Sequence, residues 1–438
     1  MSPILQLRNG FSQAAWERPL RMAACVVLSA AAAFSLARTS DKTAQTFQVF
    51  DFGAYYRAAG AVARGETPYA IDEHGPTAAF VYAPAYAFFL YPLSYLDYTW
   101  ACRLWMLGNW IVCLVCIFLA MRLVTAMKFT QNWTLLWLAT LPMASYFWNN
   151  ISAGQIGALM VALCLAWAIC QRRGRSFLGG IFLALATALK LAPALLVPYV
   201  IVRRDWRGLA GFLVGGLALV VAPAPWTGLN GAIELHLEWA RHCHNTQIGA
   251  QTCRIENQSM LGMLARLPAI DYRDLQQVYP LILLVLAGAG YVWIIWCRRG
   301  TRTPEEERSQ DNLHLALLFI LMTLAHPRAW TCNFVALTPA CFLLADRVCR
   351  RQPGWKISLA ALFLVAGSCA SWKSVAGDFS WTGWIHQGKD FWTAVAVAGA
   401  CCWCWRAGGV RPRFIAPHQC LSLEADVPSS PYSSARMA

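Results

Sequence analysis

A single acidic residue stands among aromatic side chains shortly after the first apolar segment. Asp51 lies within TFQVFDFGAYYRAAGAVARGETPY, residues 46–69, flanked by Phe50 and Phe52 and followed by Tyr55. Burial among such rings raises the pKa of a carboxylate because it disfavours the charged form. A carboxylate with a raised pKa can accept a proton near neutral pH, so Asp51 is the candidate general base.

No second acid pairs obviously with Asp51. A hydrolytic glycosidase normally uses two carboxylates, whereas displacing a phosphate from an anomeric carbon requires a base for the incoming hydroxyl and no strong acid. One carboxylate therefore favours transfer over hydrolysis, and Asp72 or Glu73 is the competing base. The other acids expected on the same side are Glu234, Glu238 and Glu256.

Three basic side chains follow apolar segments at positions where cations are uncommon. Lys190 lies in ALKLAP, and His326 and Arg328 lie in HPRAW. A charge at membrane depth costs about 2.5 to 3.5 kcal/mol on insertion scales, so an anionic partner is expected, and a phosphate would fit. The alternatives are a snorkelling lysine, an arginine that binds lipid headgroups and a histidine that only ends a helix.

Further polar and aromatic residues are expected on the same side, where they could bind sugar hydroxyls and stack against sugar rings. The four amide residues among them could instead tie helices together by hydrogen bonds. The candidate substrate-binding residues are Tyr55, Tyr56, Tyr82, Asn149, Gln155, Asn257, Gln258 and Trp330.

The composition predicts that these residues are held by a polytopic membrane protein. The chain is 58% hydrophobic and 13% charged, with 21 tryptophans in 438 residues, which exceeds what a soluble core needs. The net charge of +14 lies in short clusters between apolar runs. This distribution is typical of the positive-inside bias and does not indicate nucleic-acid binding.

About twelve transmembrane helices are expected. The first, 22–37, could imitate a signal peptide, but the spans that follow favour a retained anchor. Breaks are expected near Lys190 and His326 because several spans are short for a bilayer. The later spans are 99–121, 132–148, 154–170, 176–189, 192–202, 208–222, 279–297, 313–325, 331–346, 357–372 and 390–406.

The basic clusters predict the orientation. They fall on one side, which places both termini in the cytoplasm and the segments 38–98 and 223–278 outside the cell membrane. Within the first segment, residues 81–96 (VYAPAYAFFLYPLSYL) are expected to be interfacial, because they contain two internal prolines and four tyrosines. Residues 1–416 form the predicted transmembrane domain, and residues 417–438 form a disordered cytoplasmic tail.

The 17 cysteines lie mostly inside apolar runs, where they behave as small buried hydrophobes. Cys401, Cys402 and Cys404 form the one dense cluster, but no histidine pair accompanies them. Neither a metal ion nor another cofactor is expected.

Six segments in order resemble the polyprenol-phosphate-mannose-dependent mannosyltransferases typified by the mycobacterial enzymes of phosphatidylinositol mannoside synthesis. The resemblance covers residues 15–405. The segments are DFGAYYRAAGAVARGETPY, VYAPAYAFFLYPL, SAGQIGALMVAL, ALKLAPALLVPYVIVRR, NQSMLGMLARL and HPRAW.

This resemblance implies the GT-C architecture, a lipid-phosphate sugar donor and an acid of the first external loop as base, which corresponds to Asp51. The chain departs from the family at His326, where members usually have Ser or Thr, and at Ala83, where members have the first proline of a Pro-Pro pair.

The expected activity is transfer of a hexose, most plausibly mannose, from a polyprenyl phosphate to a hydroxyl of an external glycan or glycolipid, with inversion. The alternative is a transporter or lipid flippase, which also uses broken helices and intramembrane polar residues but usually has repeat symmetry. A third possibility is a noncatalytic assembly factor.

Overall fold

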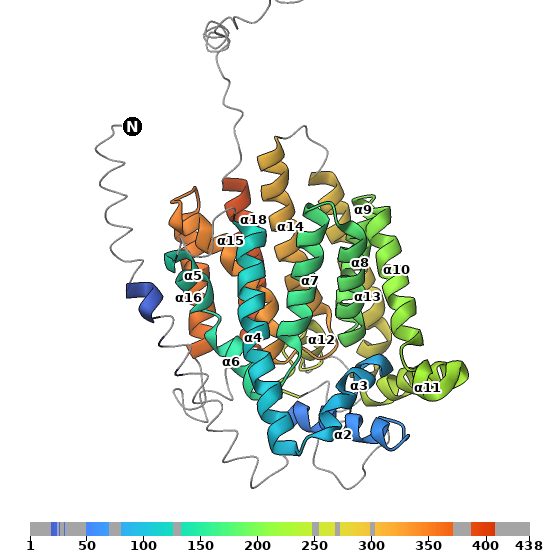
Figure 1. Ribbon diagram of the computed structural model, residues 1–438. Helices are drawn as coiled ribbons and strands as arrows, with labels where there is room; N and C mark the ends of the chain where they lie inside the picture. The colour runs from blue at the N-terminus through green and yellow to red at the C-terminus, as the bar shows by residue number, and fades with distance from the viewer. Residues whose placement is uncertain are drawn as a thin grey trace, which may run out of the picture.

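The computed structural model describes residues 19–23, 26, 30, 50–69, 80–125, 133–247, 254–267, 272–297, 303–370 and 387–407 (Figure 1). Most of the predicted first helix, Asp72, Glu73 and the predicted tail lie outside these residues. Every regular element of the described residues is a helix, as the all-helical prediction requires.

The helices form a bundle with three helices lying across one end (Figure 1). The crossing helices are α2 (Phe50–Ala63), α3 (Pro84–Leu90) and α11 (Ala224–Gln247). The others are η1 (Tyr91–Tyr95), α4 (Tyr98–Val124), α5 (Trp133–Thr140), α6 (Ala144–Ser152), α7 (Gly157–Arg172), α8 (Ser176–Leu189), η3 (Ala192–Leu196), α9 (Val197–Val202), α10 (Trp206–Val221), α12 (Met260–Leu264), α13 (Tyr272–Cys297), α14 (Pro304–Ala325), η4 (Thr331–Leu337), α15 (Thr338–Cys349), α16 (Trp355–Ala370) and α18 (Lys389–Ala407).

Two described helical segments, Tyr98–Val124 and Thr331–Cys349, are long and apolar enough to cross a membrane. The number rises to four if each of two bent helix pairs is counted as one span. Each of the eleven later spans predicted from the sequence does coincide with helix. The structure therefore supports an all-helical membrane protein, while the count of about twelve spans stays a prediction.

The predicted single helix over 132–148 was wrong, because the chain divides there into α5 and α6. Pro142 lies between the two helices. Proline lacks a backbone donor and disfavours helical geometry at the residue before it, which explains the division. The chain then bends by 119° between α6 and α7.

The predicted breaks near Lys190 and His326 are confirmed. Both residues have extended backbones, with ψ of 138° and 135°, directly after α8 and α14. A 3-10 helix follows each break: η3 begins at Ala192 and η4 begins at Thr331. Non-helical backbone at this depth requires protein or water around it, since lipid offers no hydrogen bonds.

The segment 81–96 does not form a span. It folds into α3 and η1, of seven and five residues, and a helix rises only about 1.5 Å per residue. The helix α11 also lies across the bundle, bent by 102° from α10 (Figure 1). Both arrangements agree with the predicted interfacial helices.

The turns after α7, α9 and α15, which contain arginines, lie at the end of the bundle opposite α2, α3 and α11 (Figure 1). Arg172 there donates to the Asn312 side chain and the Leu123 carbonyl, and Arg203 pairs with Asp311. The charge clusters are therefore sorted to one end, as the predicted topology requires.

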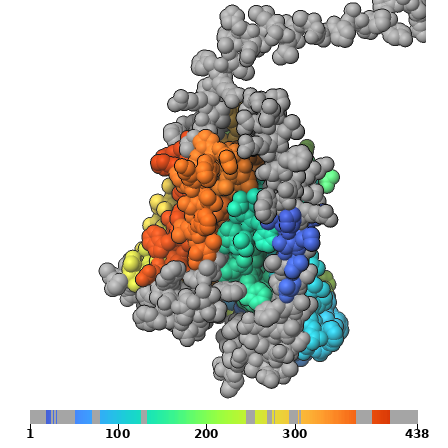
Figure 2. Space-filling model, turned by 90° about the vertical axis from the view of Figure 1, so that its left-hand side faces the viewer, coloured from blue at the N-terminus to red at the C-terminus, as the bar shows by residue number. Residues whose placement is uncertain are grey.

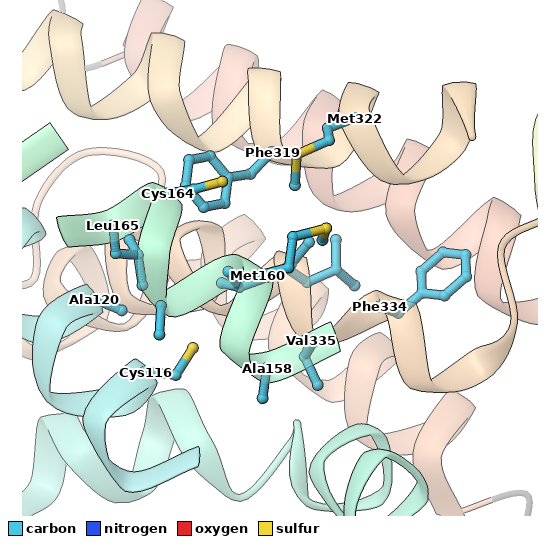
Figure 3. Close-up of a cluster of buried hydrophobic side chains, with 14 of the residues drawn as sticks. Cys116, Ala120, Ala158, Met160, Cys164, Leu165, Phe319, Met322, Phe334 and Val335 are labelled. Atoms are coloured by element: carbon cyan, nitrogen blue, oxygen red, sulfur yellow. The ribbon is translucent and has the colours of Figure 1, made fainter. Parts of the chain in front are cut away.

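The core of the bundle combines large aromatic side chains with small ones. Phe319 of α14 lies beside Cys164 of α7, and Cys116 of α4 lies on the opposite side of α7 (Figure 3). All three are almost fully buried, and both cysteines are free thiols. On another face, α15 packs against α5, and α16 packs against α6 and α18 (Figure 2).

Substitution of Gly211 by alanine should lower the melting temperature of the detergent-solubilised protein, because α8 and α10 touch through glycine. An added Cβ at Gly211 would clash with the backbone oxygen of Phe177, and one at Gly180 would clash with that of Gly208. Overpacking of this kind costs about 1 to 3 kcal/mol. A Cβ at Gly216 of α10 meets nothing within 4 Å, so Gly216→Ala is the matched control. Equal melting temperatures for the two variants would contradict the close approach.

Candidate active site

Asp51 lies in the first turn of α2 and is held by the turn between α6 and α7. Its backbone N–H donates to the Ala153 carbonyl at 3.2 Å, and the Gln155 amide donates to the Asp51 Oδ2 atom. The N-terminus of a helix also favours a negative charge. Both the backbone and the side chain of Asp51 are therefore bound to the turn between α6 and α7.

Burial raises the pKa of Asp51 to about 6, and the nearby Lys190 ammonium offsets part of the rise. Phe52 contributes to this burial and is itself fully enclosed. This rise in the pKa of Asp51 agrees with the rise expected from its aromatic neighbours. A carboxyl with this pKa is mostly ionised at neutral pH and can still take up a proton, which suits a general base.

The turn between α6 and α7 is shaped by specific polar contacts. Gly154 has φ +67°, a conformation that favours glycine, and its carbonyl accepts from the Trp105 indole at 2.9 Å. The side-chain oxygen of the fully buried Asn150 accepts from the Ala158 N–H at 3.1 Å and so caps the start of α7.

The side chain of Asn333 in η4 links the Lys190 ammonium to the backbone of Arg328. The Lys190 ammonium donates to Asn333 Oδ1 at 2.7 Å, and the Asn333 amide donates to the Arg328 carbonyl at 3.2 Å. The break after α8 and the break after α14 therefore meet, although their residues are far apart in sequence. Lys190 and Asp51 do not form a direct ion pair, so the ammonium and the carboxylate each have a different hydrogen-bond partner.

Arg328 carries buried donors that are unused. Its Nε and Nη2 atoms have no hydrogen-bond partner among the described residues. Buried donors are normally paired, since an unpaired one costs free energy. An anionic ligand would pair them. The neighbouring His326 accepts from the Arg328 N–H at 3.0 Å through Nδ1, so only its other nitrogen is left for a ligand.

Aromatic side chains pack beside Asp51. The hydroxyls of Tyr55 and Tyr82 are 2.8 Å apart, and the Tyr55 ring centroid lies 5.4 Å from that of Trp105. The Tyr86 hydroxyl is buried beside them without a partner in the described chain. Tyr56 differs, because its hydroxyl donates to the Leu96 carbonyl at 2.7 Å.

Two of the four predicted amide residues, Asn257 and Gln258, make contacts to other segments that favour a tying role. Asn257 donates to the Pro327 carbonyl at 2.9 Å and accepts from the Ala329 N–H at 3.0 Å. The backbone N–H of Gln258 donates to the Ala329 carbonyl at 2.7 Å. These contacts hold the turn that presents Arg328.

Asn149 donates to the Ser145 carbonyl of its own helix at 2.9 Å. Trp330 caps η4 and is 39% exposed, so its ring is open to a ligand or to lipid. Glu238, one of the other acids, accepts from the Thr67 hydroxyl at 2.8 Å.

Asp390 is a fully buried carboxylate that was not predicted as a site residue from the sequence. It is fully enclosed and accepts from the Tyr146 and Thr331 hydroxyls at 3.0 and 2.7 Å and from Lys389 at 2.7 Å. Its partners come from α6, η4 and the start of α18, so it ties these elements together. The signal was the charged pair at the start of the last predicted span, since charges there require partners.

No group of three metal-binding side chains occurs in the described part of the chain. Cys404 instead lies 3.2 Å from the Ser358 hydroxyl, within the packing of α16 and α18.

The chain is similar in sequence to mycobacterial mannosyltransferases. The chain is 29% identical over 218 residues to a protein of Mycolicibacterium smegmatis named polyprenol-phosphate-mannose-dependent alpha-(1-2)-phosphatidylinositol mannoside mannosyltransferase, covering 49% of this chain and 47% of the relative. A protein of the same name from Mycobacterium tuberculosis is 28% identical over 251 residues, or 55% of this chain and 53% of the relative.

A third relative, a polyprenol-phosphate-mannose-dependent alpha-(1-2)-phosphatidylinositol pentamannoside mannosyltransferase of Mycobacterium tuberculosis, is 25% identical over 284 residues, covering 64% of this chain and 61% of the relative. The chain thus spans about half to three fifths of the length of these relatives. No solved structure matches it.

The model of glycosyltransferase family 87 matches residues 80–327, which is more than half of the chain. The match includes Lys190 and His326, whereas Asp51 precedes it. The resemblance seen in the sequence is therefore confirmed, and the chain belongs to glycosyltransferase family 87.

Proposed function

We propose that this protein transfers mannose from a polyprenyl phosphate to a hydroxyl of an external glycan or glycolipid. The observation that carries the proposal is the convergence of Asp51, Lys190 and Arg328 at one end of the bundle. Lys190 acts on the charge of Asp51, and Asn333 links Lys190 to the turn that carries Arg328. A base with cations nearby is what transfer from a lipid phosphate requires. Family membership favours this activity over the transporter or flippase alternative.

The proposed step is a single displacement with inversion. Asp51 takes the proton of the acceptor hydroxyl while the oxygen of that hydroxyl attacks the anomeric carbon. The bond from that carbon to the phosphate oxygen breaks, and the electron pair stays on the phosphate. Lys190 and Arg328 stabilise the growing negative charge, which fixed cations do best where water is scarce. His326 has one ring nitrogen left to assist them.

The sugar and the lipid carrier rest on the relatives, whose names specify polyprenol-phosphate-mannose and phosphatidylinositol mannosides. We propose the same donor class for this chain and an acceptor of the glycan or glycolipid class. The rings of Tyr55 and Tyr82 and the indole of Trp330 supply apolar faces for the sugar.

Radiolabelled polyprenyl-phosphate sugars, incubated with the purified protein and a membrane extract, test the proposed activity. We expect label to move from the mannose donor to extractable lipid or glycan and to move less from other sugars. Failure of every donor to release label to any acceptor would overturn the proposal.

Transfer should depend on pH through Asp51. The base must be ionised, and its pKa is about 6. The rate should therefore be full well above pH 6, half-maximal near pH 6 and about tenfold lower for each further unit of acidification. The measurement is the initial rate of label transfer between pH 4.5 and pH 8, with protein stability checked at each pH. A rate that stays constant down to pH 4.5 would show that the base is not Asp51.

We also propose the complete topology expected from the sequence. It has about twelve spans in a domain of residues 1–416, both termini and the tail 417–438 in the cytoplasm, and Asp51 outside. The sorting of basic turns away from the Asp51 end supports it. A green fluorescent protein fused to the C-terminus should fluoresce in cells, and a fused alkaline phosphatase should be inactive. The reverse pattern would contradict the orientation.

A further inference from the structure

We infer that Gln155 is a positioning residue: its side chain orients the Asp51 carboxylate and favours the ionised form of that carboxylate. This inference rests on the proposed function and departs from the sequence-based expectation that Gln155 binds substrate. The side-chain amide of Gln155 donates to Asp51 Oδ2 and is therefore engaged before any substrate arrives.

The turn that carries Gln155 is fixed from several directions. The Gln155 N–H donates to the Asn150 carbonyl at 2.8 Å, and the preceding Gly154 carbonyl accepts from Trp105 at 2.9 Å. A Cβ at Gly154 would lie only 3.0 Å from the Phe52 Cβ, so α2 rests directly on this turn. The amide therefore has little freedom to leave the carboxylate.

The contact gives the two carboxylate oxygens of Asp51 different roles. Oδ2 accepts from Gln155, while Oδ1 has no hydrogen-bond partner among the described residues. The oxygen without a partner is the one that can take the acceptor proton. The backbone contact from Asp51 to Ala153, a neighbour of Gln155 in the same turn, prevents the carboxylate from rotating away together with α2.

The charge environment also gives Gln155 a specific effect. Asp51 is influenced by Lys190 at the end of α8, and its own charge acts on Tyr55 of α2, Tyr82 before α3 and Cys332 of η4. The phenols and the thiol are neutral near pH 6, so they do not compensate the charge of the carboxylate. A hydrogen bond to the ionised form lowers the pKa of a carboxyl, whereas burial raises it. Loss of the Gln155 donor should therefore raise the pKa of Asp51.

Gln155→Met removes the donor at similar length, and Gln155→Glu replaces it with a second acid. We expect the protonation midpoint of Asp51 to rise by about one pH unit in Gln155→Met. It should rise further in Gln155→Glu, since two adjacent carboxyls cannot both ionise easily. The acid limb of the pH–rate profile should move by the same amounts, while KM for the lipid donor stays unchanged. Ser152→Ala is the matched control, because Ser152 is exposed in the same region and lies outside the site.

The decisive readout is infrared titration of the Asp51 carboxyl band, assigned by its loss in Asp51→Asn. It requires no turnover, so it separates failure of this inference from failure of the proposed transfer. Unchanged midpoints in folded Gln155→Met and Gln155→Glu would overturn the inference. A raised KM with an unchanged midpoint would instead indicate that Gln155 binds substrate, as the sequence predicted. If Gln155→Met proves unstable, the Gln155→Glu midpoint alone decides.

Discussion

The Asp51→Asn variant should transfer mannose about 10² to 10⁴ times more slowly than the wild type, which is the range that a placed general base contributes. Asparagine has nearly the same shape and can occupy the same place beside Gln155, but it cannot accept the proton of the acceptor hydroxyl. The measurement is the initial rate of label transfer at pH 7.5, at equal amounts of folded protein.

Glu66→Gln provides the matched control for this loss. Glu66 is an exposed acid just after α2 and pairs only with the exposed Arg64. Exposed pairs of this kind contribute little to stability. We expect the control to retain the wild-type rate. A wild-type rate in Asp51→Asn would remove Asp51 as the base and would direct the search to Asp72 and Glu73.

Lys190→Met and Arg328→Met should each lower the rate about 10² to 10³ times, because each removes a fixed donor from the leaving phosphate. The loss should appear in kcat as well as in kcat/KM, since the charge that these residues stabilise grows as the bond breaks. The Nε and Nη2 donors of Arg328 are buried and have no partner among the described residues, so a ligand would not have to displace one of these residues.

The double variant tests whether the two cations act on one group. If both contact the same phosphate, the loss in Lys190→Met/Arg328→Met should be smaller than the product of the single losses. Arg64→Gln, which removes an exposed cation, should leave the rate unchanged. Independent losses that multiply would place the two cations on different parts of the reaction.

The features of the fold that depend on nearby sequence could be predicted. Apolar runs and basic clusters predicted the helices and their sorting to two ends, because both depend on nearby sequence alone. Pro142 divides the predicted span over 132–148, and this break was not predicted. The 119° bend between α6 and α7 could not be predicted, because it depends on Asn150 capping a helix from across the turn and on α2 packing against it.

The site was predicted in its residue types more than in its contacts. Asp51 and Lys190 were identified because acids and cations beside apolar segments are costly without a partner. Asn333 was missed because a polar residue in an apolar helix gains its role from distant segments. Asp390 was missed although Lys389 and Asp390 form a charged pair at the start of the last predicted span. Gln155 was identified, but the sequence could not show that its amide faces Asp51.

The central claim is that this site uses a lipid phosphate as the leaving group. The measurement that tests it most directly compares two donors, polyprenyl-phosphate mannose and a nucleotide-linked mannose, both carrying the same radiolabel, with the purified protein and membrane extract. We expect transfer of label from the lipid donor and none from the nucleotide donor. Transfer from the nucleotide donor, or none from the lipid donor, would contradict it.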